Sequence, residues 1–227
     1  MKRNARKIAV AGATGMVGQA FLRLLEDKFT DAEIVLLASK KSEGKKVYFR
    51  NKDYFIQNLS DYDFTDTDLA LFSAGASVSK EFAPIAVSQG CVVVDNSSCF
   101  RYEENIPLIV PEVNGYELND YKQPGIIANP NCSTIQMLVA LKPIHDEFNI
   151  KRIDVTTLQA VSGTGKEATE ELISQLDAYQ GRTDQSVAIY PKQIANNVLP
   201  HCDVFESNRY TNCLLYTSDA ADERLRV

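Results

Sequence analysis

The sequence predicts an α/β fold built on a parallel sheet. Short runs of Val, Ile, Leu and Ala recur along the first 130 or so residues, and segments with helical spacing separate them. A glycine-rich turn at Gly12–Gly18 (GATGMVG) joins the first apolar run to the first helix. Because strands that are buried on both faces have continuous apolar sequences, this alternation is typical of parallel strands covered by helices.

The elements of this first part follow in order. A helix is expected after the glycine turn, because apolar residues from Val17 to Leu25 recur at helical spacing, and another is expected at Ser79–Gln89. The apolar runs predict strands at Lys7–Ala11, Glu33–Ala38, Leu69–Ser73, Cys91–Asp95, Leu108–Pro111 and Gly125–Ala128.

The pattern changes after Ile150. Arg152–Ala160 alternates apolar and polar residues, which predicts a half-solvated antiparallel strand, and Glu167–Tyr179 predicts a polar amphipathic helix. We therefore expect one domain at residues 1–131 and a second, α+β portion at residues 132–211.

Composition excludes several classes of protein. The 227 residues are 44% hydrophobic and 24% charged, which predicts a packed core. A net charge of −6, without a dense Lys/Arg stripe, argues against nucleic-acid binding, and no apolar run reaches membrane-spanning length. The five cysteines show no CxxC spacing, so we expect reduced thiols, a cytoplasmic protein and no metal.

The glycine turn predicts dinucleotide binding. Gly12, Gly15 and Gly18 follow a strand and open a helix, so the backbone can approach a pyrophosphate that rests on the helix N-terminus. A merely tight strand-to-helix turn is the alternative.

The residues after the second predicted strand favour NADP. An acidic residue there would bind the ribose 2′-OH of NAD, but this chain has Ser39, Lys40, Lys41 and Ser42. Cations and hydroxyls suit a 2′-phosphate. The alternative is a solvated surface loop.

A cysteine stands at a predicted helix start. Asn131 precedes Cys132, and Ile135–Leu141 continues as an apolar run. The unpaired N–H groups and the positive dipole end of a helix favour the thiolate, which is the nucleophile. A small buried packing residue is the alternative.

Together these segments resemble the aspartate-semialdehyde dehydrogenase family, in order and from residue 7 to about residue 211. The matching pieces are Gly12–Gly18 (GATGMVG), Leu37–Ser42 (LASKKS), Phe72–Gly75 (FSAG), Val94–Arg101 (VDNSSCFR), Val110–Asn114 (VPEVN), Asn129–Thr134 (NPNCST) and Leu158–Gly165 (LQAVSGTG).

The resemblance implies a Rossmann-like doubly wound sheet followed by an incomplete α+β catalytic and dimerisation domain. It implies interconversion of aspartate β-semialdehyde plus phosphate with β-aspartyl phosphate, with NADP as cofactor, in lysine, threonine and methionine biosynthesis. Cys132 would carry the thioester, which keeps the acyl group activated for attack by phosphate. The parent enzyme is expected to be a homodimer or homotetramer.

The resemblance also implies roles for individual residues. Arg101 and Asn131 match the phosphate-binding pair, and Gln159 matches the glutamine that orients the substrate. Lys41 stands where an arginine is common, so the preference for NADP is expected to be softer. The cofactor side comprises Gly12, Ala13, Thr14, Gly15, Met16, Val17, Ser39, Lys41, Ser42, Ser73, Gly75, Asn96, Ser162 and Gly163.

Some expected parts do not match. The family's general base is a histidine, but neither His145 nor His201 stands at that position. Residues 212–227 resemble no part of the family and are expected to be a non-family tail. We therefore expect a C-terminally truncated fragment with little turnover.

Two other functions stay open at this stage. One is an N-acetyl-glutamyl-phosphate reductase, which tends to have a glycine before the cysteine and an aromatic residue after it; Asn131 and Ser133 favour the aspartate enzyme instead. The other is a nucleotide-binding module without chemistry.

Overall fold

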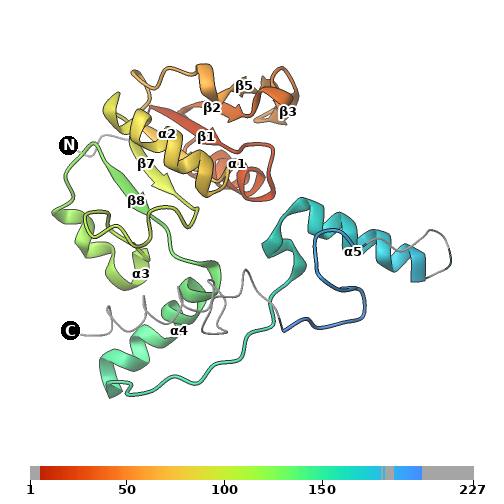
Figure 1. Ribbon diagram of the computed structural model, residues 1–227. Helices are drawn as coiled ribbons and strands as arrows, with labels where there is room; N and C mark the ends of the chain where they lie inside the picture. The colour runs from red at the N-terminus through yellow and green to blue at the C-terminus, as the bar shows by residue number, and fades with distance from the viewer. Residues whose placement is uncertain (1–5, 180, 182–186, 201–227) are drawn as a thin grey trace. The chain divides into compact units, whose positions relative to one another are not determined.

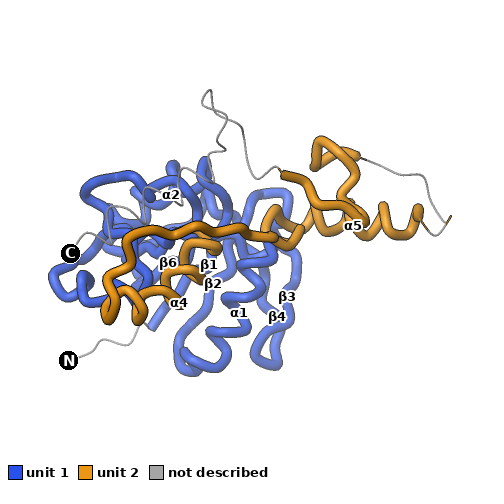
Figure 2. Tube along the Cα trace, turned by 90° about the horizontal axis from the view of Figure 1, so that it is seen from below, with its two compact units in different colours: residues 1–130 blue, residues 131–227 orange. Residues whose placement is uncertain are grey.

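The computed structural model describes residues 6–179, 181 and 187–200. The chain divides into two compact units, with the division between Pro130 and Asn131 (Figure 2). The expected tail at residues 212–227, together with His201, Cys202 and Cys213, lies outside the described residues.

Unit 1 is built on a parallel sheet of six strands (Figure 1). Its order is β5-β2-β1-β6-β7-β8, and every neighbouring pair is parallel. Because the chain proceeds outward from β1 on one side and from β6 on the other, the sheet is doubly wound, which confirms the predicted fold class. The strands are β1 (Lys7–Ala11), β2 (Glu33–Ala38), β5 (Gln57–Asn58), β6 (Leu69–Phe72), β7 (Val92–Asp95) and β8 (Ile126–Ala128).

Helices cover both faces of this sheet. Figure 2 shows α1 (Met16–Lys28) and α2 (Ala76–Ser88) on opposite sides of the strands. Right-handed crossovers that run in opposite directions across a sheet require this arrangement. Residues 8–11 of β1 are fully buried, and α1 packs Leu22 and Leu25 against the sheet. The continuous apolar strands of the sequence are thus central strands.

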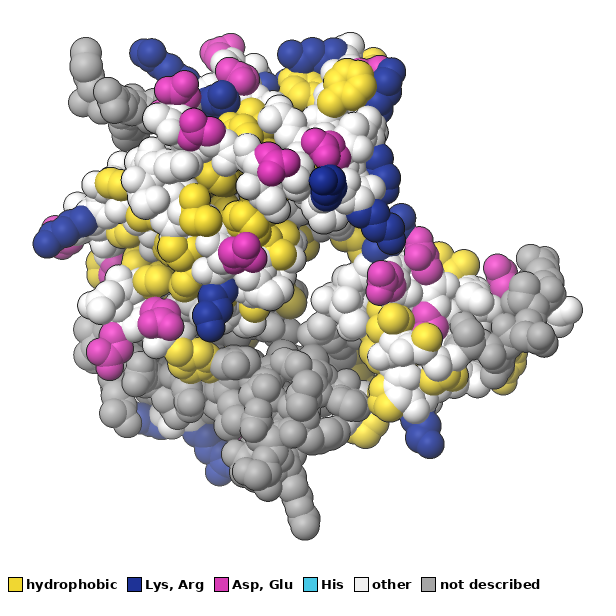
Figure 3. Space-filling view, turned by 45° about the horizontal axis from the view of Figure 1, so that its top comes forward, with side chains coloured by type: hydrophobic (Ala, Val, Ile, Leu, Met, Phe, Trp, Pro, Cys, Tyr) yellow, Lys and Arg dark blue, Asp and Glu magenta, His cyan; other side chains and the backbone are white. Residues whose placement is uncertain are grey.

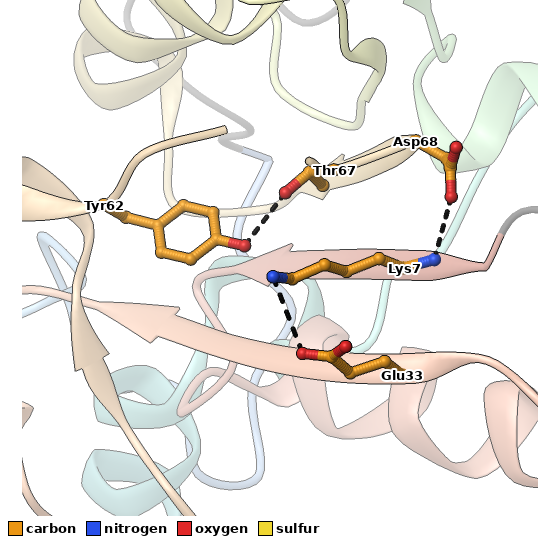
Figure 4. A network of polar contacts seen from close by, with 5 residues as sticks. All are labelled: Lys7, Glu33, Tyr62, Thr67 and Asp68. Carbon is orange, nitrogen blue, oxygen red and sulfur yellow. Dashed lines mark hydrogen bonds and ion pairs between the residues drawn. The ribbon is translucent and has the colours of Figure 1, made fainter. Parts of the chain in front are cut away.

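Polar contacts hold the amino end of β1 (Figure 4). The carboxylate of Asp68 accepts hydrogen bonds from the backbone N–H groups of Arg6 and Lys7, at 2.7 and 2.9 Å. The Lys7 ammonium lies 3.6 Å from the Glu33 carboxylate on the neighbouring strand. These contacts fix the register of β1, which determines where its carboxyl end delivers the glycine turn.

A two-stranded hairpin, β3 (Lys46–Phe49) and β4 (Lys52–Phe55), was not predicted. Its turn residues, Arg50 and Asn51, have φ values of 50° and 57°, the positive angles that a tight two-residue hairpin turn requires. The Arg50 guanidinium donates to the carbonyl of Ala32 at 2.7 Å and to carbonyls at the end of α1. The hairpin is thereby tied to the cation-favouring end of that helix. Its sequence signal is the valine and the aromatic residues of KVYF and KDYF, which favour strands and flank Arg50 and Asn51.

The strand expected at Leu108–Pro111 is wrong. Leu108 makes one isolated parallel bridge with Ala128, and the short helix α3 (Pro111–Asn114) begins at the proline. The Asn114 side chain accepts from the backbone N–H of Val110 at 2.8 Å and donates to the carbonyl of Leu108 at 3.0 Å. A side chain that takes these backbone groups competes with a strand ladder.

Unit 2 contains α4 (Cys132–Phe148), the 3-10 turn η4 (Val161–Thr164) and α5 (Lys166–Tyr179). The strand expected at Arg152–Ala160 is wrong, because the segment pairs with no other part of the described chain. A strand exists only where a neighbour satisfies its backbone groups, and alternation alone cannot provide one.

Helix α5 organises the segment that follows it. The Glu171 carboxylate is buried and accepts from the backbone N–H groups of Ala188 and Ile189, at 2.8 and 2.6 Å. The amide oxygen of Gln175 accepts from Ile194 and Ala195, at 2.9 and 3.0 Å. The sequence predicts this helix as polar, but two of its polar side chains, Glu171 and Gln175, are buried between the helix and the segment that follows.

Candidate active site

The glycine turn lies where the strand order of the sheet reverses. Gly12 follows β1 with φ of +87°, and a Cβ there would lie 2.8 Å from the carbonyl carbon of Ser73, which follows β6. A Cβ on Gly18 would lie 2.2 Å from the carbonyl oxygen of Gly12, so α1 packs directly on the turn. The backbone contacts therefore require glycine at both positions, at the point where such sheets bind ligands.

The N-terminus of α1 fits an anion. The helix begins at Met16, and its N-cap residue, Gly15, provides no side-chain cap for the first N–H groups. The turn itself is held in place, since the N–H of Gly12 donates to the carbonyl of Leu37 at 2.9 Å and Gln19 donates to that of Ala13 at 2.7 Å. Uncapped N–H groups on a fixed turn suit a dinucleotide pyrophosphate.

The cofactor-side residues of unit 1 follow four different strands. Ser39, Lys41 and Ser42 come after β2, where Lys40–Ser42 form the 3-10 turn η1. Gly75 comes after β6, with φ of +95° and open space where its Cβ would lie, and Asn96 comes directly after β7. Because carboxyl ends of parallel strands share one edge, the structure brings these predicted residues together along that edge.

Arg101 connects the ends of two strands. Its Nε donates to the main-chain carbonyl of Asn129 at 3.0 Å, and its Nη2 donates to that of Asn96 at 3.2 Å. The side chains of Asn129 and Asn96 are themselves hydrogen-bonded at 2.5 Å. Arg101 is therefore oriented by the loops after β7 and β8. In the sequence Asn129 stands out only as part of the family-like segment Asn129–Thr134, and its pairing with Asn96 carries no sequence signal.

In unit 2, Cys132 is the first residue of α4, as predicted. The side-chain oxygen of its N-cap residue, Asn131, accepts from the N–H of Ser133 at 2.9 Å and lies 3.8 Å from the Cys132 sulfur. The thiol is exposed, whereas Cys91 is buried and Cys99 is partly buried. Loss of solvation raises the pKa of the Cys91 thiol to about 12 and also raises that of Cys99.

Cys132 opens onto a cavity of about 780 Å³ within unit 2. Three other predicted site residues, Gln159, Ser162 and Gly163, line the same cavity. A Cβ at position 163 would lie 2.3 Å from Nε2 of Gln159, so the glycine allows the amide to lie against η4. The structure thus places the thiol, the amide and the small loop around one space.

Other predicted residues do not line this cavity. The cofactor-side residues that precede Asn131, together with Arg101, belong to unit 1. His145 lies in the last turns of α4, is partly buried and does not line the cavity. Within the described parts of the chain, no cluster of three His, Cys, Asp or Glu residues could hold a metal ion. No described helix is both long enough and apolar enough to cross a membrane.

Comparison with known proteins identifies both parts of the chain. Residues 7–121 match the NAD-binding domain of semialdehyde dehydrogenases, and residues 141–223 match the dimerisation domain of semialdehyde dehydrogenases. Aspartate-semialdehyde dehydrogenase of Legionella pneumophila is 56% identical over 206 residues, which are 90% of this chain and 59% of that protein. The chain thus spans about three fifths of the length of that relative.

Solved structures agree with this assignment. The crystal structure of aspartate semialdehyde dehydrogenase II from Vibrio cholerae, complexed with ASA, matches with a TM-score of 0.93 and 43% identity over 98% of this chain and 66% of that chain. The enzyme from Candida albicans with NADP matches with a TM-score of 0.59 and 33% identity over 70% of this chain and 52% of that one. The chain belongs to the semialdehyde dehydrogenase family, and the relatives that it resembles here are aspartate-semialdehyde dehydrogenases.

Proposed function

We propose that this chain carries the nucleophile and the nucleotide site of an NADP-dependent, phosphorylating aspartate-semialdehyde dehydrogenase. The observation that carries the proposal is the shared cavity of Cys132 and Gln159, with Ser162 and Gly163 on the adjoining loop. A thiol, an amide and a compact loop are the groups that acyl transfer through a thioester uses. The relatives support aspartate semialdehyde as the substrate.

The chemistry begins at the sulfur of Cys132. The thiolate adds to the aldehyde carbon, a C–S bond forms, and the oxygen takes a proton to give a thiohemiacetal. The amide of Gln159 orients that oxygen by hydrogen bonding. Bound NADP would supply the acceptor for the hydride that leaves the same carbon. The hydroxyl proton is released to water as the C=O bond re-forms, so that a thioester remains on Cys132. A phosphate oxygen then attacks the thioester, the C–S bond breaks, and the sulfur leaves as thiolate.

In this proposal Arg101 and Asn131 bind the phosphate that attacks the thioester. A guanidinium is a fixed fork of donors that suits phosphate oxygens, and the loop carbonyls of Asn96 and Asn129 orient that of Arg101. Asn131 caps α4 beside the thiol, so its amide is held next to the attacking sulfur.

NADP rather than NAD is proposed because the loop after β2 carries Lys41 between hydroxyls, without an acidic residue at the family position. The NADP bound to the Candida albicans relative supports this choice. Lys41 provides charge without the bidentate geometry of arginine, so the proposed preference is moderate.

Slow turnover is part of the proposal. Histidine is the usual base near neutral pH, and among the described residues no histidine lines the Cys132 cavity. A second copy of the chain is the proposed partner, in a homodimer or homotetramer, supported by the match of residues 141–223 to a dimerisation domain. We place the protein in the cytoplasm, where its thiols stay reduced.

Acylation of Cys132 tests the proposal independently of turnover. The chain is incubated with aspartate semialdehyde and NADP without phosphate, and the protein is mapped by mass spectrometry. We expect an aspartyl mass on Cys132 and stoichiometric NADPH, and neither in Cys132→Ser, while Cys99→Ser behaves as the parent.

Two outcomes contradict the proposal. Nucleotide binding without any acyl adduct indicates the non-catalytic module. Faster acylation by N-acetyl-glutamate semialdehyde than by aspartate semialdehyde indicates the related reductase.

A further inference from the structure

A second lysine stands beside the proposed 2′-phosphate loop. The ammonium nitrogen of Lys45 lies 3.5 Å from the hydroxyl oxygen of Ser42, a residue of η1. In the sequence Lys45 lies three residues beyond that turn and just before β3, so the sequence alone predicts no role for it. In the structure its side chain extends back toward the Ser42 hydroxyl.

The backbone holds this arrangement in place. The N–H of Ser42 donates to the carbonyl of Ser39 at 2.8 Å, and the N–H of Lys45 donates to that of Ser42 at 3.2 Å. Gly44 and Lys45 also pair with Ile56, through two hydrogen bonds of 2.9 Å each. Since Ile56 is buried, the loop is anchored to the core and its polar groups are pre-organised for a ligand.

The loop also carries net positive charge, because three lysines outnumber its one carboxylate, Glu43. Lys40, Lys41 and Lys45 are exposed, and none of them forms an ion pair with a carboxylate within the described residues. Lys46, the next residue, differs: its ammonium lies 2.8 Å from the Asp53 carboxylate and over the ring of Phe55. Figure 3 shows Lys and Arg side chains along the edge of unit 1 on the side where Figure 1 labels β3 and β5.

We propose that Lys45 is a specificity-determining residue for the 2′-phosphate of NADP, acting together with Ser42. This inference rests on the proposed NADP site and extends it beyond η1. A dianionic phosphate bound at the hydroxyls of Ser39 and Ser42 would also contact the Lys45 ammonium, which lies 3.5 Å from the Ser42 hydroxyl. This second cation compensates for the single-point contact that Lys41 provides in place of a forked arginine.

Binding of nucleotide fragments tests the inference on the intact chain and needs no catalysis. Affinities for 2′,5′-ADP and 5′-AMP are measured by calorimetry for the parent, Lys45→Met and Lys46→Met. We expect Lys45→Met to weaken the binding of 2′,5′-ADP by about three- to tenfold and to leave that of 5′-AMP unchanged, because one solvent-exposed hydrogen bond is lost. Lys46→Met changes neither affinity, because that ammonium is committed to Asp53.

A double-mutant cycle sharpens the test. If Lys45 and Ser42 bind the phosphate as a pair, Ser42→Ala costs less in the Lys45→Met background than in the parent. Lys45→Arg restores the preference for 2′,5′-ADP.

The outcomes separate this inference from the function on which it rests. If the parent prefers 2′,5′-ADP but Lys45→Met and Lys46→Met have the same affinities, the role of Lys45 is overturned and the NADP proposal stands. A parent that binds the two fragments equally, or binds neither, overturns the NADP proposal and this inference with it.

Discussion

The guanidinium of Arg101 holds the main-chain carbonyl of Asn129, with Nε and oxygen 3.0 Å apart. Asn129 follows the edge strand β8, and the chain continues from it toward the N-cap of α4. The same guanidinium donates to Asn96 after β7. A residue predicted as a phosphate ligand therefore also fixes the loop that leads to the nucleophile.

Replacing Arg101 should reduce stability as well as phosphate use. We expect Arg101→Ala to lower the free energy of unfolding by about 1–3 kcal/mol, because the part-buried carbonyls of Asn96 and Asn129 lose a charged hydrogen-bond donor. Urea unfolding measures this, with Arg152→Ala as the matched control. Arg152 forms an exposed ion pair with Asp154, its one ion pair among the described residues, so its loss should cost about 0.5 kcal/mol or less. Equal losses in the two variants contradict the role of Arg101.

Two glycines with similar positive φ values should respond differently to alanine. Gly12→Ala introduces positive-φ strain and a Cβ that meets the backbone of Ser73, so we expect a loss of about 3 kcal/mol or more. Gly75→Ala also strains the backbone, at φ of 95° and ψ of 162°, but has open space around it, so about 1–3 kcal/mol is expected. Thermal unfolding compares them, and NADP titration should show no binding in Gly12→Ala. A larger loss in Gly75→Ala would falsify the packing argument.

Gly163→Ala should impair acylation without unfolding unit 2. The three atoms nearest to the new Cβ all belong to the Gln159 side chain, which can rotate away, so the free energy of unfolding should change by less than about 1 kcal/mol. The displaced amide no longer orients the aldehyde oxygen, and we expect the rate of Cys132 acylation to fall by at least about tenfold. Gly115→Ala serves as the control, because Gly115 is helical, its new Cβ would make an ordinary contact with Pro111 at 3.9 Å, and it does not line the Cys132 cavity. An unchanged acylation rate in Gly163→Ala means that the amide position does not matter.

Acid should loosen the segment after α5. Burial raises the pKa of Glu171, but backbone hydrogen bonds from Ile189, Ala188 and Tyr190 outweigh it, and the net pKa lies below its ordinary value of 4.5. The folded carboxyl therefore binds protons less readily than the unfolded one. Its contribution to stability is complete above about pH 4.5 and is lost as the pH falls through the folded pKa.

This pH dependence is measured by urea unfolding between pH 7 and pH 3. Glu171→Gln should be less stable at pH 7 and should lose less stability on acidification than the parent. Glu170→Gln is the control, since its carboxylate pairs with Lys166 at an exposed site. Parallel acid curves for the parent and Glu171→Gln contradict the assignment.

The described cysteines should react in a fixed order with iodoacetamide at pH 8. Cys132 is exposed and reacts first, Cys99 is partly buried and follows, and Cys91 stays unmodified because burial raises the pKa of its thiol to about 12. Peptide mapping resolves each site. Protection of Cys132 by aspartate semialdehyde with NADP, without protection of Cys99, links the reactive thiol to the proposed substrate.

The sequence by itself determined the local elements and the chemistry at their ends. The apolar runs identified β1 and β2 with their observed bounds, because strands buried on both faces need continuous apolar residues. The glycine spacing located the turn before α1, and Asn131 before Cys132 located the start of α4, because caps and turns depend on neighbouring residues.

Only the tertiary structure decided which distant groups meet. Arg152–Ala160 alternates like a strand but has no partner in the described chain, and Leu108–Pro111 loses its ladder to the Asn114 side chain. The bond from Arg101 to Asn129 joins residues 28 positions apart that backbone folding brings together. Gly163 beside Gln159 and Lys45 beside Ser42 are neighbours in sequence, but the conformation of each loop decides that their atoms meet. Such contacts depend on packing and on competition for backbone hydrogen bonds, which no local pattern specifies.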